Sequence, residues 1–431
     1  MTTSTIAIIL LIGIFLALII VKVPIPIALI ASTTVSMIYL DIPLMTMVQQ
    51  MAKSINSFSL MAVPFFILAG EIMGAGGISD KMVDFANAIV GRFRGGLACV
   101  NCLDSMFFGG ISGSAVADVS SLGSIVIPMM EKSGYDRDFA IALTVTTSCQ
   151  GVLIPPSHNM IFFALAAGGV SVGKLFLGGA IPGIMLGLAL MVYSLIIAHK
   201  RNYPKGEALG FREVIKVTLS ALVALFTAVI IMGGVTLGFF TATESAAIAC
   251  IYAFLISVFL YKKLAIRDLP RILANVVNTL CLSFSLIAAA GAFGYVLAYL
   301  KVPALLTNLL LSITDNRVVL LLLINVMLLF LGCIMDMAPI IFIVTPILLP
   351  VVTQLGMDTV HFGVMMIFNL ALGLCTPPVG SALFVGCAVG KSSIERVVKE
   401  LLPMYMVMII CLLLVTFVPA LSTFLPNLIM P

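Results

Sequence analysis

Two pairs of consecutive prolines lie inside long apolar segments, each with small oxygen-bearing side chains beside it. The first pair is Pro155–Pro156 in LIPPSHN (153–159), and the second is Pro377–Pro378 in GLCTPPVGSALFVG (373–386). The polar side chains nearest to them are Ser157, Asn159, Thr376 and Ser381. A proline breaks a helix because it lacks the backbone N–H and clashes with the preceding turn. The freed carbonyls can coordinate a cation, and a free helix N-terminus attracts an anion.

Two glycine-rich interruptions, GGISGS (109–114) and GCIMD (332–336), add further polar groups. The polar residues in or just after them are Ser112, Ser114, Asp118 and Asp336. Hard oxygen ligands of this kind suit Na⁺. An acidic residue inside an apolar span is so costly that it indicates a function. These residues predict a site for a coupling cation.

The elements that must position these groups are membrane helices. The 431 residues are 62% hydrophobic and 9% charged, with a mean hydropathy of +1.25, whereas soluble domains are about a quarter charged. Apolar runs of roughly 20 residues recur along the chain, as helical spans require. The net charge of +4 comes from basic residues in short loops and does not indicate nucleic-acid binding. Three histidines and the single CxxC of Cys99 and Cys102 do not indicate a zinc site.

We expect an all-α polytopic membrane protein with about ten full spans and two re-entrant helical hairpins. The expected spans are about 5–21, 24–40, 57–74, 138–170, 176–198, 214–237, 243–261, 273–300, 360–390 and 400–425. The regions 95–130 and 318–351 are too long for one crossing and contain the glycine-rich interruptions, so each is interpreted as a hairpin. No basic region precedes the first span, which is therefore expected to be retained rather than cleaved.

The two halves of the chain match at an offset of 222 positions (377 − 155), which relates the two proline pairs. The same offset pairs Gly110 with Gly332, Pro128 with Pro350, Gly134 with Gly356, Asp136 with Asp358 and Gly151 with Gly373. Helix breakers in register over about 60 positions predict an internal repeat. Because the expected topology gives the two copies opposite orientations, the repeat is inverted, as in many secondary transporters.

Basic loops predict the orientation. HKRNYPKG (199–206) and YKKLAIRDLPR (261–271) are expected on the cytoplasmic side, which places both termini outside. The expected division is an N-terminal scaffold (1–56), a first repeat (57–210), linking scaffold helices (211–272) and a second repeat (273–431). Each repeat contains one hairpin followed by one broken helix.

Three other charged residues have simpler explanations than a binding site. Glu244 opens a span in FFTATESAA (239–247) and is expected to cap its N-terminus. Lys301 follows a span and is expected to extend to the membrane interface, with attraction of an anionic substrate as the alternative. Asp104 is expected to pair with a loop cation.

Three motifs together resemble signatures of the large membrane subunit of TRAP (tripartite ATP-independent periplasmic) transporters. They are FFTATESAA (239–247), GLCTPPVG (373–380) and FFGGISGSAVAD (107–118). The resemblance covers essentially the whole chain and implies an elevator-type secondary transporter of a bacterial inner membrane. It also implies Na⁺ as the coupling ion, no other cofactor, a carboxylate substrate, a periplasmic substrate-binding protein, and a small four-helix membrane subunit as a separate chain. The sequence is most similar to the sialic-acid branch.

The resemblance also implies which residues form the sites. The implied sodium ligands are Ser112, Ser114, Asp118, Pro156 and Asn159 in one cluster, and Gly332, Asp336, Thr376 and Gly380 in the other. The implied substrate-binding residues are Ser114, Ser157, Asn159, Asp336 and Ser381. Na⁺ bound at the second proline pair would order the neighbouring hairpin and shape the anion site.

Other functions remain open at this point. A stand-alone Na⁺- or H⁺-coupled anion symporter of similar build would need no binding protein. An intramembrane serine protease would use Ser112 as nucleophile and His158 as base, but it needs one site, whereas this chain repeats its break. A channel is the third alternative. We expect a transporter rather than an enzyme, and the sequence contains no GxxxxGK[ST] phosphate loop for ATP.

Overall fold

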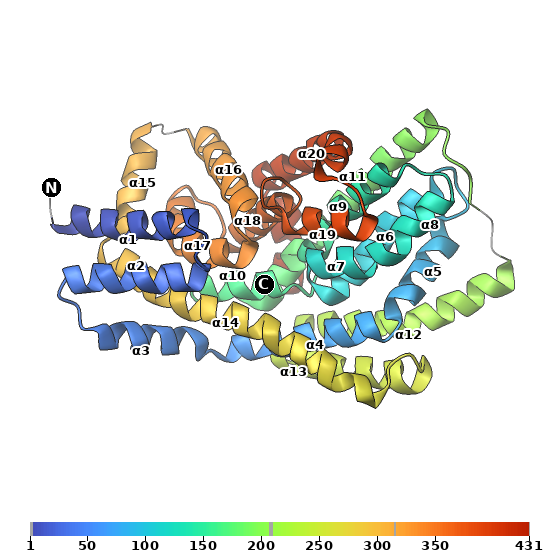
Figure 1. The fold of residues 1–431 in the computed structure, drawn as a ribbon, viewed down its shortest axis with the longest axis horizontal. Helices are drawn as coiled ribbons and strands as arrows, with labels where there is room; N and C mark the ends of the chain where they lie inside the picture. Colours follow the sequence, from blue (N-terminus) through green and yellow to red (C-terminus); the bar gives the residue numbers. More distant parts are fainter. Residues whose placement is uncertain (1–2, 207–209, 314–315, 431) are drawn as a thin grey trace.

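The computed structural model describes residues 3–206, 210–313 and 316–430, which fold almost entirely into helices (Figure 1). Residues 207–209 of the expected first repeat and 314–315 and 431 of the second lie outside the described residues. The described part holds no β-strand, only an isolated bridge between Arg94 and Lys205. The expected all-α fold class is confirmed.

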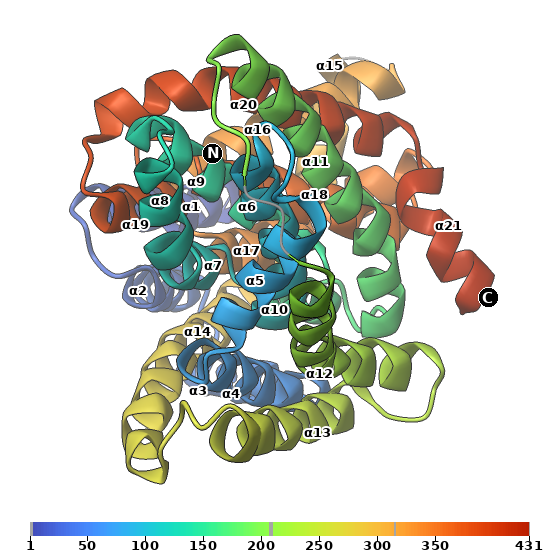
Figure 2. The ribbon, with the colours of Figure 1, turned by 90° about the vertical axis from the view of Figure 1, so that its right-hand side faces the viewer.

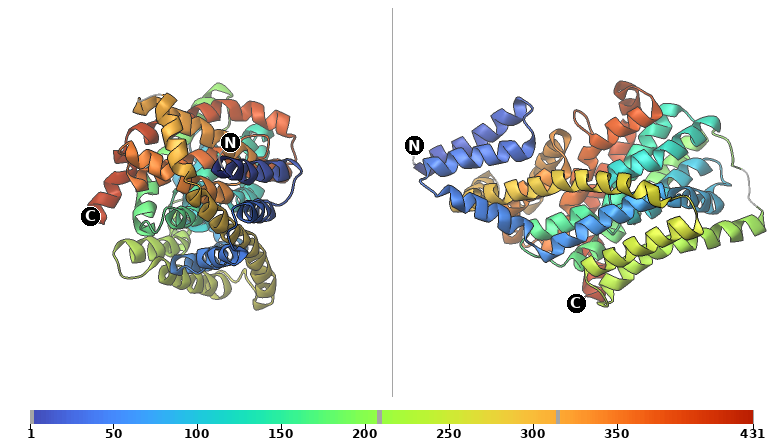
Figure 3. Two further views of the ribbon diagram at one scale, coloured as in Figure 1. Left: turned by 90° about the vertical axis from the view of Figure 1, so that its left-hand side faces the viewer. Right: turned by 60° about the horizontal axis from the view of Figure 1, so that its bottom comes forward.

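One group of helices lies, apart from α1 and α2, along one side of the molecule (Figure 2). It consists of α1 (Thr3–Ile20), α2 (Ile25–Tyr39), α3 (Leu44–Ile55), α4 (Ala62–Ala75), α12 (Phe211–Thr236), α13 (Ala242–Leu255) and α14 (Leu269–Tyr299). The pair α1 and α2 lies at one end of the molecule (Figure 3). The helix α14 packs against α2, α3 and α4. It runs unbroken for 31 residues because its proline, Pro270, occupies the first turn, where no backbone donor is needed.

The other group contains the interrupted segments. In the first half of the chain these are α6 (Gly96–Ser112), α7 (Ala115–Ser121), α8 (Gly123–Lys132), α9 (Arg137–Leu153), α10 (His158–Ala166) and α11 (Val172–Lys200). In the second half they are α16 (Arg317–Ile334), α17 (Met337–Gln354), α18 (Thr359–Leu374), α19 (Ser381–Gly390) and α20 (Ile394–Phe417). Phe139–Leu153 of α9 and Val360–Leu374 of α18 are buried at every residue, so these two helices form the centre of the core.

The expected spans agree with the described helices in most places. Nine described helices are long and apolar enough to cross a membrane, and ten if the bent pair of α9 and α10 counts as one span. Both expected hairpins are interrupted close to the glycine-rich sequences, after Ser112 in the first and after Ile334 in the second.

Three features of the structure were not expected from the sequence. The short helices α3, α5 (Ile78–Val90) and α15 (Val302–Ile313) lie in segments that we left without an element. The second arm of the first hairpin is divided at Leu122 into α7 and α8. The expected span 400–425 ends at Phe417 and is followed by α21 (Ala420–Ile429), because Pro419 has no backbone N–H to continue α20.

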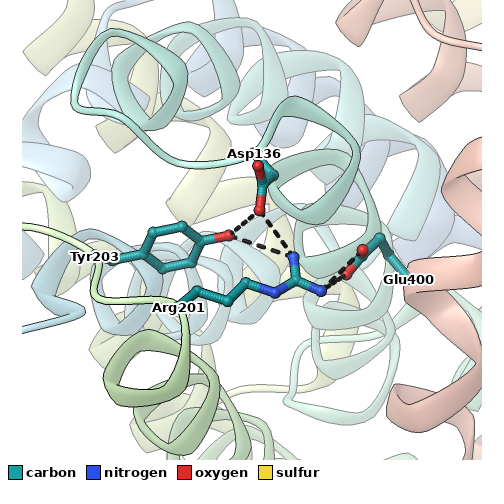
Figure 4. Close-up of polar contacts among 4 residues, drawn as sticks. All are labelled: Asp136, Arg201, Tyr203 and Glu400. Carbon is teal, nitrogen blue, oxygen red and sulfur yellow. Dashed lines mark hydrogen bonds and ion pairs between the residues drawn. The ribbon is translucent and has the colours of Figure 1, made fainter.

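The expected cytoplasmic loop 199–206 contacts three other segments of the chain, at Asp136, Glu400 and Arg94. Arg201 donates to Asp136 (2.9 Å) and to both carboxylate oxygens of Glu400 (2.9 and 2.8 Å), and Tyr203 donates to Asp136 (2.6 Å; Figure 4). Burial and the bond to Asp136 raise the pKa of Tyr203 to about 12. Arg94 pairs with the same loop through its bridge to Lys205. These contacts place the starts of α9 and α20 beside the end of α11.

Candidate functional site

Both proline pairs break a helix at the expected place. Between α9 and α10 the peptide bond of Pro155–Pro156 is cis, and the two helices meet at an angle of 50°. Between α18 and α19 the peptide bond of Pro377–Pro378 is also cis. Each break interrupts the regular helical hydrogen bonding for about one turn, because its two prolines have no N–H to donate.

The first arm of each hairpin crosses the broken helix of the same half at a pair of glycines. A Cβ atom at Gly109 of α6 would lie 2.1 Å from the Cα of Gly151 in α9. A Cβ atom at Gly373 of α18 would lie 2.6 Å from the Cα of Gly332 in α16. Real Cβ atoms do not approach this closely, so the backbones touch because all four residues are glycine.

Amide and hydroxyl side chains join the same helices further from the break. Asn101 of α6 donates to Thr144 (2.7 Å) and accepts from Thr147 (3.1 Å), both in α9. In the second half, Asn369 of α18 donates to the backbone carbonyl and to the side-chain oxygen of Asn325 in α16, each at 2.9 Å. All of these side chains are buried, so each pairing satisfies polar groups that have no access to water.

The tip of each hairpin also contacts the neighbouring break. Gly113 adopts φ +63°, and a Cβ atom there would lie 2.7 Å from the carbonyl oxygen of Pro156. In the second half, the backbone N–H of Val379 donates to the carbonyl of Cys333 at 3.0 Å. In each half, therefore, the hairpin tip packs directly against the helix break.

The two broken helices contact each other through a pair of thiols. Cys149 of α9 donates to the carbonyl of Ala371, and Cys375 at the end of α18 donates to the carbonyl of Val145, both at 3.1 Å. The two Sγ atoms are 3.0 Å apart. These contacts bring the two breaks into one region of the core.

The main cavity, of about 680 Å³, gathers part of the expected site. Ser112, Ser114, Asn159 and Asp336 all line it, so the tips of both hairpins and the start of α10 form one wall. Ser114 caps α7, where its hydroxyl accepts from the Ala117 backbone N–H (3.4 Å). Asp336 precedes α17, makes no side-chain capping bond, and is exposed to the cavity. The wall therefore offers two hydroxyls, an amide and a carboxylate.

The other expected residues lie behind this wall, at the two breaks. They are Asp118, Pro156, Ser157, Gly332, Thr376, Gly380 and Ser381, and none of them lines the main cavity. Thr376 donates to the carbonyl of Leu372 (2.8 Å). Gly380 must be glycine, because a Cβ atom there would lie 2.8 Å from the carbonyl oxygen of Thr376.

Several polar atoms behind the wall have no hydrogen-bond partner among the described residues. They include both carboxylate oxygens of Asp118 and the hydroxyls of Ser157 and Ser381. Asp118 and Ser157 are almost completely buried, at 1% and 0% exposure. Buried polar groups are normally satisfied, so these oxygens have free coordination capacity that fits a bound cation.

Four residues of the main cavity were missed in the sequence. Glu71 of α4 and Asn275, Thr279 and Ser283 of α14 form the opposite wall. Asn275 donates to Glu71 at 3.4 Å. The sequence contains two signals that could have identified these residues. Glu71 is an acidic residue within the expected span 57–74. The three polar residues of the span 273–300 are four positions apart, so they lie on one helix face.

The contacts around Ser112 and His158 do not form a nucleophile–base pair. Ser112 accepts from the Ser114 backbone N–H (3.4 Å), and the His158 ring lies 3.3 Å from the Asn159 amide. No hydrogen bond joins Ser112 to His158 in the described part of the chain. A Ser–His pair within hydrogen-bond reach is what serine catalysis requires.

Three charged residues outside the site can be compared with their expected roles. Glu244 caps α13, because it accepts from the Thr241 backbone N–H (2.8 Å) and hydroxyl (2.9 Å); the expectation is confirmed. The expectation for Asp104 is wrong: it is fully buried, and neither of its oxygens has a hydrogen-bond partner among the described residues. Lys301 follows α14 with φ +55° and lines neither the main cavity nor the second cavity described below.

The sequence comparisons with known proteins agree on one family. The family described as "Tripartite ATP-independent periplasmic transporter, DctM component" matches residues 12–421. The chain is 40% identical to the sialic acid TRAP transporter large permease protein SiaM of Vibrio cholerae, covering 88% of this chain and 89% of that protein. It is 35% identical to the C4-dicarboxylate TRAP transporter large permease protein DctM of Rhodobacter capsulatus, covering 97% and 98%. The solved YdaH transporter of Alcanivorax borkumensis has a similar fold, with a TM-score of 0.61 at 13% identity over 86% of each chain.

Proposed function

Because the chain belongs to the TRAP transporter family, as a large permease of the DctM type, we propose that it couples uptake of an organic carboxylate to sodium influx. As a TRAP large permease, it is a multi-span membrane protein of secondary transport that works with a periplasmic binding protein. The sodium coupling, the substrate and the individual site residues are our proposal.

The observation that carries the sodium assignment is the group of unsatisfied oxygens behind the cavity wall. Asp118 and Ser157 are buried without hydrogen-bond partners among the described residues, and they lie beside the first hairpin and the first break. Free backbone carbonyls and hard side-chain oxygens at such a break suit Na⁺. In our proposal Gly332, Asp336, Thr376 and Gly380 provide the second cation site, at the second hairpin tip and the second break.

The movement that we propose is of the elevator type. The hairpins and broken helices, α6–α10 and α16–α19, would move as one unit, because glycine crossings and buried amides join them. The helices α1–α4 and α12–α14 would stay fixed as the scaffold. The main cavity lies between the two groups, where a substrate would be carried past α14.

For the substrate we favour sialic acid, with a C4-dicarboxylate as the second candidate. The relative named for sialic acid is 40% identical, and those named for C4-dicarboxylates are 35% to 39% identical, so sequence identity favours sialic acid only slightly. The main cavity, at about 680 Å³, is within the usual range for small-molecule sites and large enough for a sugar acid. Its hydroxyl and amide groups suit a hydroxyl-rich ligand.

We further propose that the basic loops around Arg201 and Lys263 face the cytoplasm and that both termini face the periplasm. Arg201 and Lys205 of the expected cytoplasmic loop 199–206 contact Asp136 before α9, Glu400 of α20 and Arg94, so we place these segments on the same side as that loop. A small four-helix membrane subunit and a periplasmic binding protein would complete the transporter in the bacterial inner membrane.

The experiment is uptake into proteoliposomes that contain this chain and the separate small subunit, with the binding protein outside. We expect accumulation of radiolabelled sialic acid only when an inward Na⁺ gradient and the binding protein are both present. A C4-dicarboxylate with its own binding protein is the parallel trial. Equal uptake without a Na⁺ gradient would contradict sodium coupling, and equal uptake without any binding protein would favour the stand-alone symporter.

A further inference from the structure

A second cavity, of about 440 Å³, lies between α3, α14, the end of α10 and α17. Phe342 of α17 lines this second cavity, and its ring centroid lies 5.5 Å from that of Phe162, which lines the main cavity. The aromatic pair therefore lies between the two cavities. Both cavities use α14 as a wall, the main cavity at Asn275–Ser283 and the second cavity at Ile287–Gly294.

The helix α3 directs its polar face toward the second cavity. Gln50, Lys53 and Ser54 lie on one face of α3 and line the cavity, and Ser57, just after the helix, lines it too. Apolar residues of the same helix, among them Met45 and Val48, are 65% and 54% exposed. A helix that presents apolar side chains outward and polar ones to a cavity has its polar face in an aqueous space.

Close packing fixes α3 in this position. A Cβ atom at Gly291 of α14 would lie 1.7 Å from the hydroxyl oxygen of Ser54. Since Lys53 precedes Ser54, its backbone is held at the edge of the cavity by this contact. Among the ion pairs of the described residues, none involves Lys53. Its ammonium group is available to a ligand.

The offset between the two halves relates the walls of the two cavities. Position 53 plus 222 is Asn275, and position 57 plus 222 is Thr279, so equivalent positions line the second and the main cavity. The charges differ, however. The described lining of the second cavity includes Lys53 and no acidic residue, whereas that of the main cavity includes Glu71 and Asp336 and no Lys or Arg.

The two cavities also lie toward opposite ends of α14. The main cavity shares Gly74, Ala75 and Ser121 with a smaller cavity that Lys263 lines, so it continues toward the basic loops. The second cavity lies along the later half of α14, toward Lys301. With the orientation proposed above, the second cavity faces the periplasm.

We propose that the second cavity is the periplasmic receiving site for the anionic substrate and that Lys53 binds its carboxylate there. This inference rests on the proposed function. A cation in a cavity with low-dielectric walls raises the local concentration of an anion and its association rate. The lysine on the receiving side and the acids on the opposite side would together favour capture outside and release inside.

The first test compares Lys53→Gln with Lys53→Arg in the reconstituted uptake assay. At low concentrations of loaded binding protein we expect Lys53→Gln to lower the initial uptake rate by about tenfold or more, within the range of electrostatic steering. Lys53→Arg keeps the charge and should retain the rate, as should the control Lys301→Gln, whose lysine lines neither cavity. If wild-type uptake is Na⁺-driven and Lys53→Gln is equally active, the inference is overturned while the proposed function stands.

The second test changes the charge at one position in a folded protein. Lys53→Cys is made with Cys281→Ser, because Cys281 is exposed, and is treated in right-side-out vesicles with membrane-impermeant methanethiosulfonates. We expect the trimethylammonium reagent to restore uptake and the sulfonate reagent to lower it further, with no effect of either on the Cys281→Ser parent. Equal responses to the two reagents, or no labelling from the periplasmic side, would overturn the proposal.

Discussion

Gly109 of α6 lies against Gly151 of α9 so closely that a Cβ atom at Gly109 would be 2.1 Å from the Gly151 Cα. The crossing lies just before the Pro155–Pro156 break and just before the tip of the hairpin. The second half repeats the arrangement with Gly332 and Gly373. Contact between two backbones fixes the position of a hairpin tip without any polar side chain, which leaves the oxygens at the tip free for a ligand.

We predict that Gly109→Ala and Gly373→Ala each displace a hairpin from its broken helix, because a Cβ atom at either position would meet the backbone of the facing glycine. Overpacking of this kind destabilises a protein by about 1–3 kcal/mol, and here it should also lower uptake, because the cavity wall moves with the hairpin. Uptake and the thermal midpoint of the purified protein are the two measurements. Gly233→Ala in α12 is the control, since a Cβ atom there has no neighbour within 4 Å. Unchanged uptake in both Gly109→Ala and Gly373→Ala would show that the crossings are not needed.

Asp336→Asn should weaken the response to sodium. Asn keeps the shape of the side chain but removes the negative charge that faces the main cavity. We expect the Na⁺ concentration for half-maximal uptake to rise about tenfold, which corresponds to about 1.4 kcal/mol. Asp41→Asn is the matched control, because Asp41 is exposed with φ +54°, a conformation that Asn also adopts readily. A normal Na⁺ dependence in Asp336→Asn would remove this residue from the ion site.

The hydrogen-bonded amides of Asn325 and Asn369 predict a loss of stability when one of them is removed. Asn369→Ala should leave the carbonyl and side-chain oxygens of buried Asn325 without the two bonds that Asn369 now donates. A buried group left unsatisfied costs about 1–3 kcal/mol, so we expect a lower free energy of unfolding. Asn427→Ala, at an exposed position, is the comparison. If the two variants are equally stable, the amides do not join α16 to α18.

The breaks could be predicted from the sequence because proline and glycine act on the backbone itself. Pro155–Pro156 and Pro377–Pro378 end α9 and α18 whatever surrounds them, and Gly113 marks a turn with positive φ. The positions of the two hairpin interruptions followed from those residues, whereas the short helices α3, α5 and α15 did not. The assignment of Glu244 to a cap was also local, since a capping box needs only four consecutive residues.

The lining of the cavity could not be predicted in the same way, because it depends on which helices pack face to face. Asp118 and Asp336 look alike in the sequence, yet one is buried behind the wall and the other faces the main cavity. Glu71 joins the site only because α4 and α14 lie opposite the hairpin tips. Asp104 was placed near a loop by its position in the chain, whereas packing around α6 buries it.

Arg201 should stabilise the transporter by joining the starts of two helices that are far apart in the sequence. Its guanidinium donates hydrogen bonds to both carboxylate oxygens of Glu400, which lies in the first half of α20. It also donates to one carboxylate oxygen of Asp136, which directly precedes α9. Lysine cannot form this two-pronged contact, so Arg201→Lys should lower the unfolding free energy nearly as much as Arg201→Ala. The Arg201 side chain is 33% exposed and that of Glu400 23%, so water weakens the pair and we expect a coupling of about 1 kcal/mol. A double-mutant cycle of Arg201→Ala and Glu400→Gln measures this coupling, and strictly additive losses would mean that the two side chains act independently.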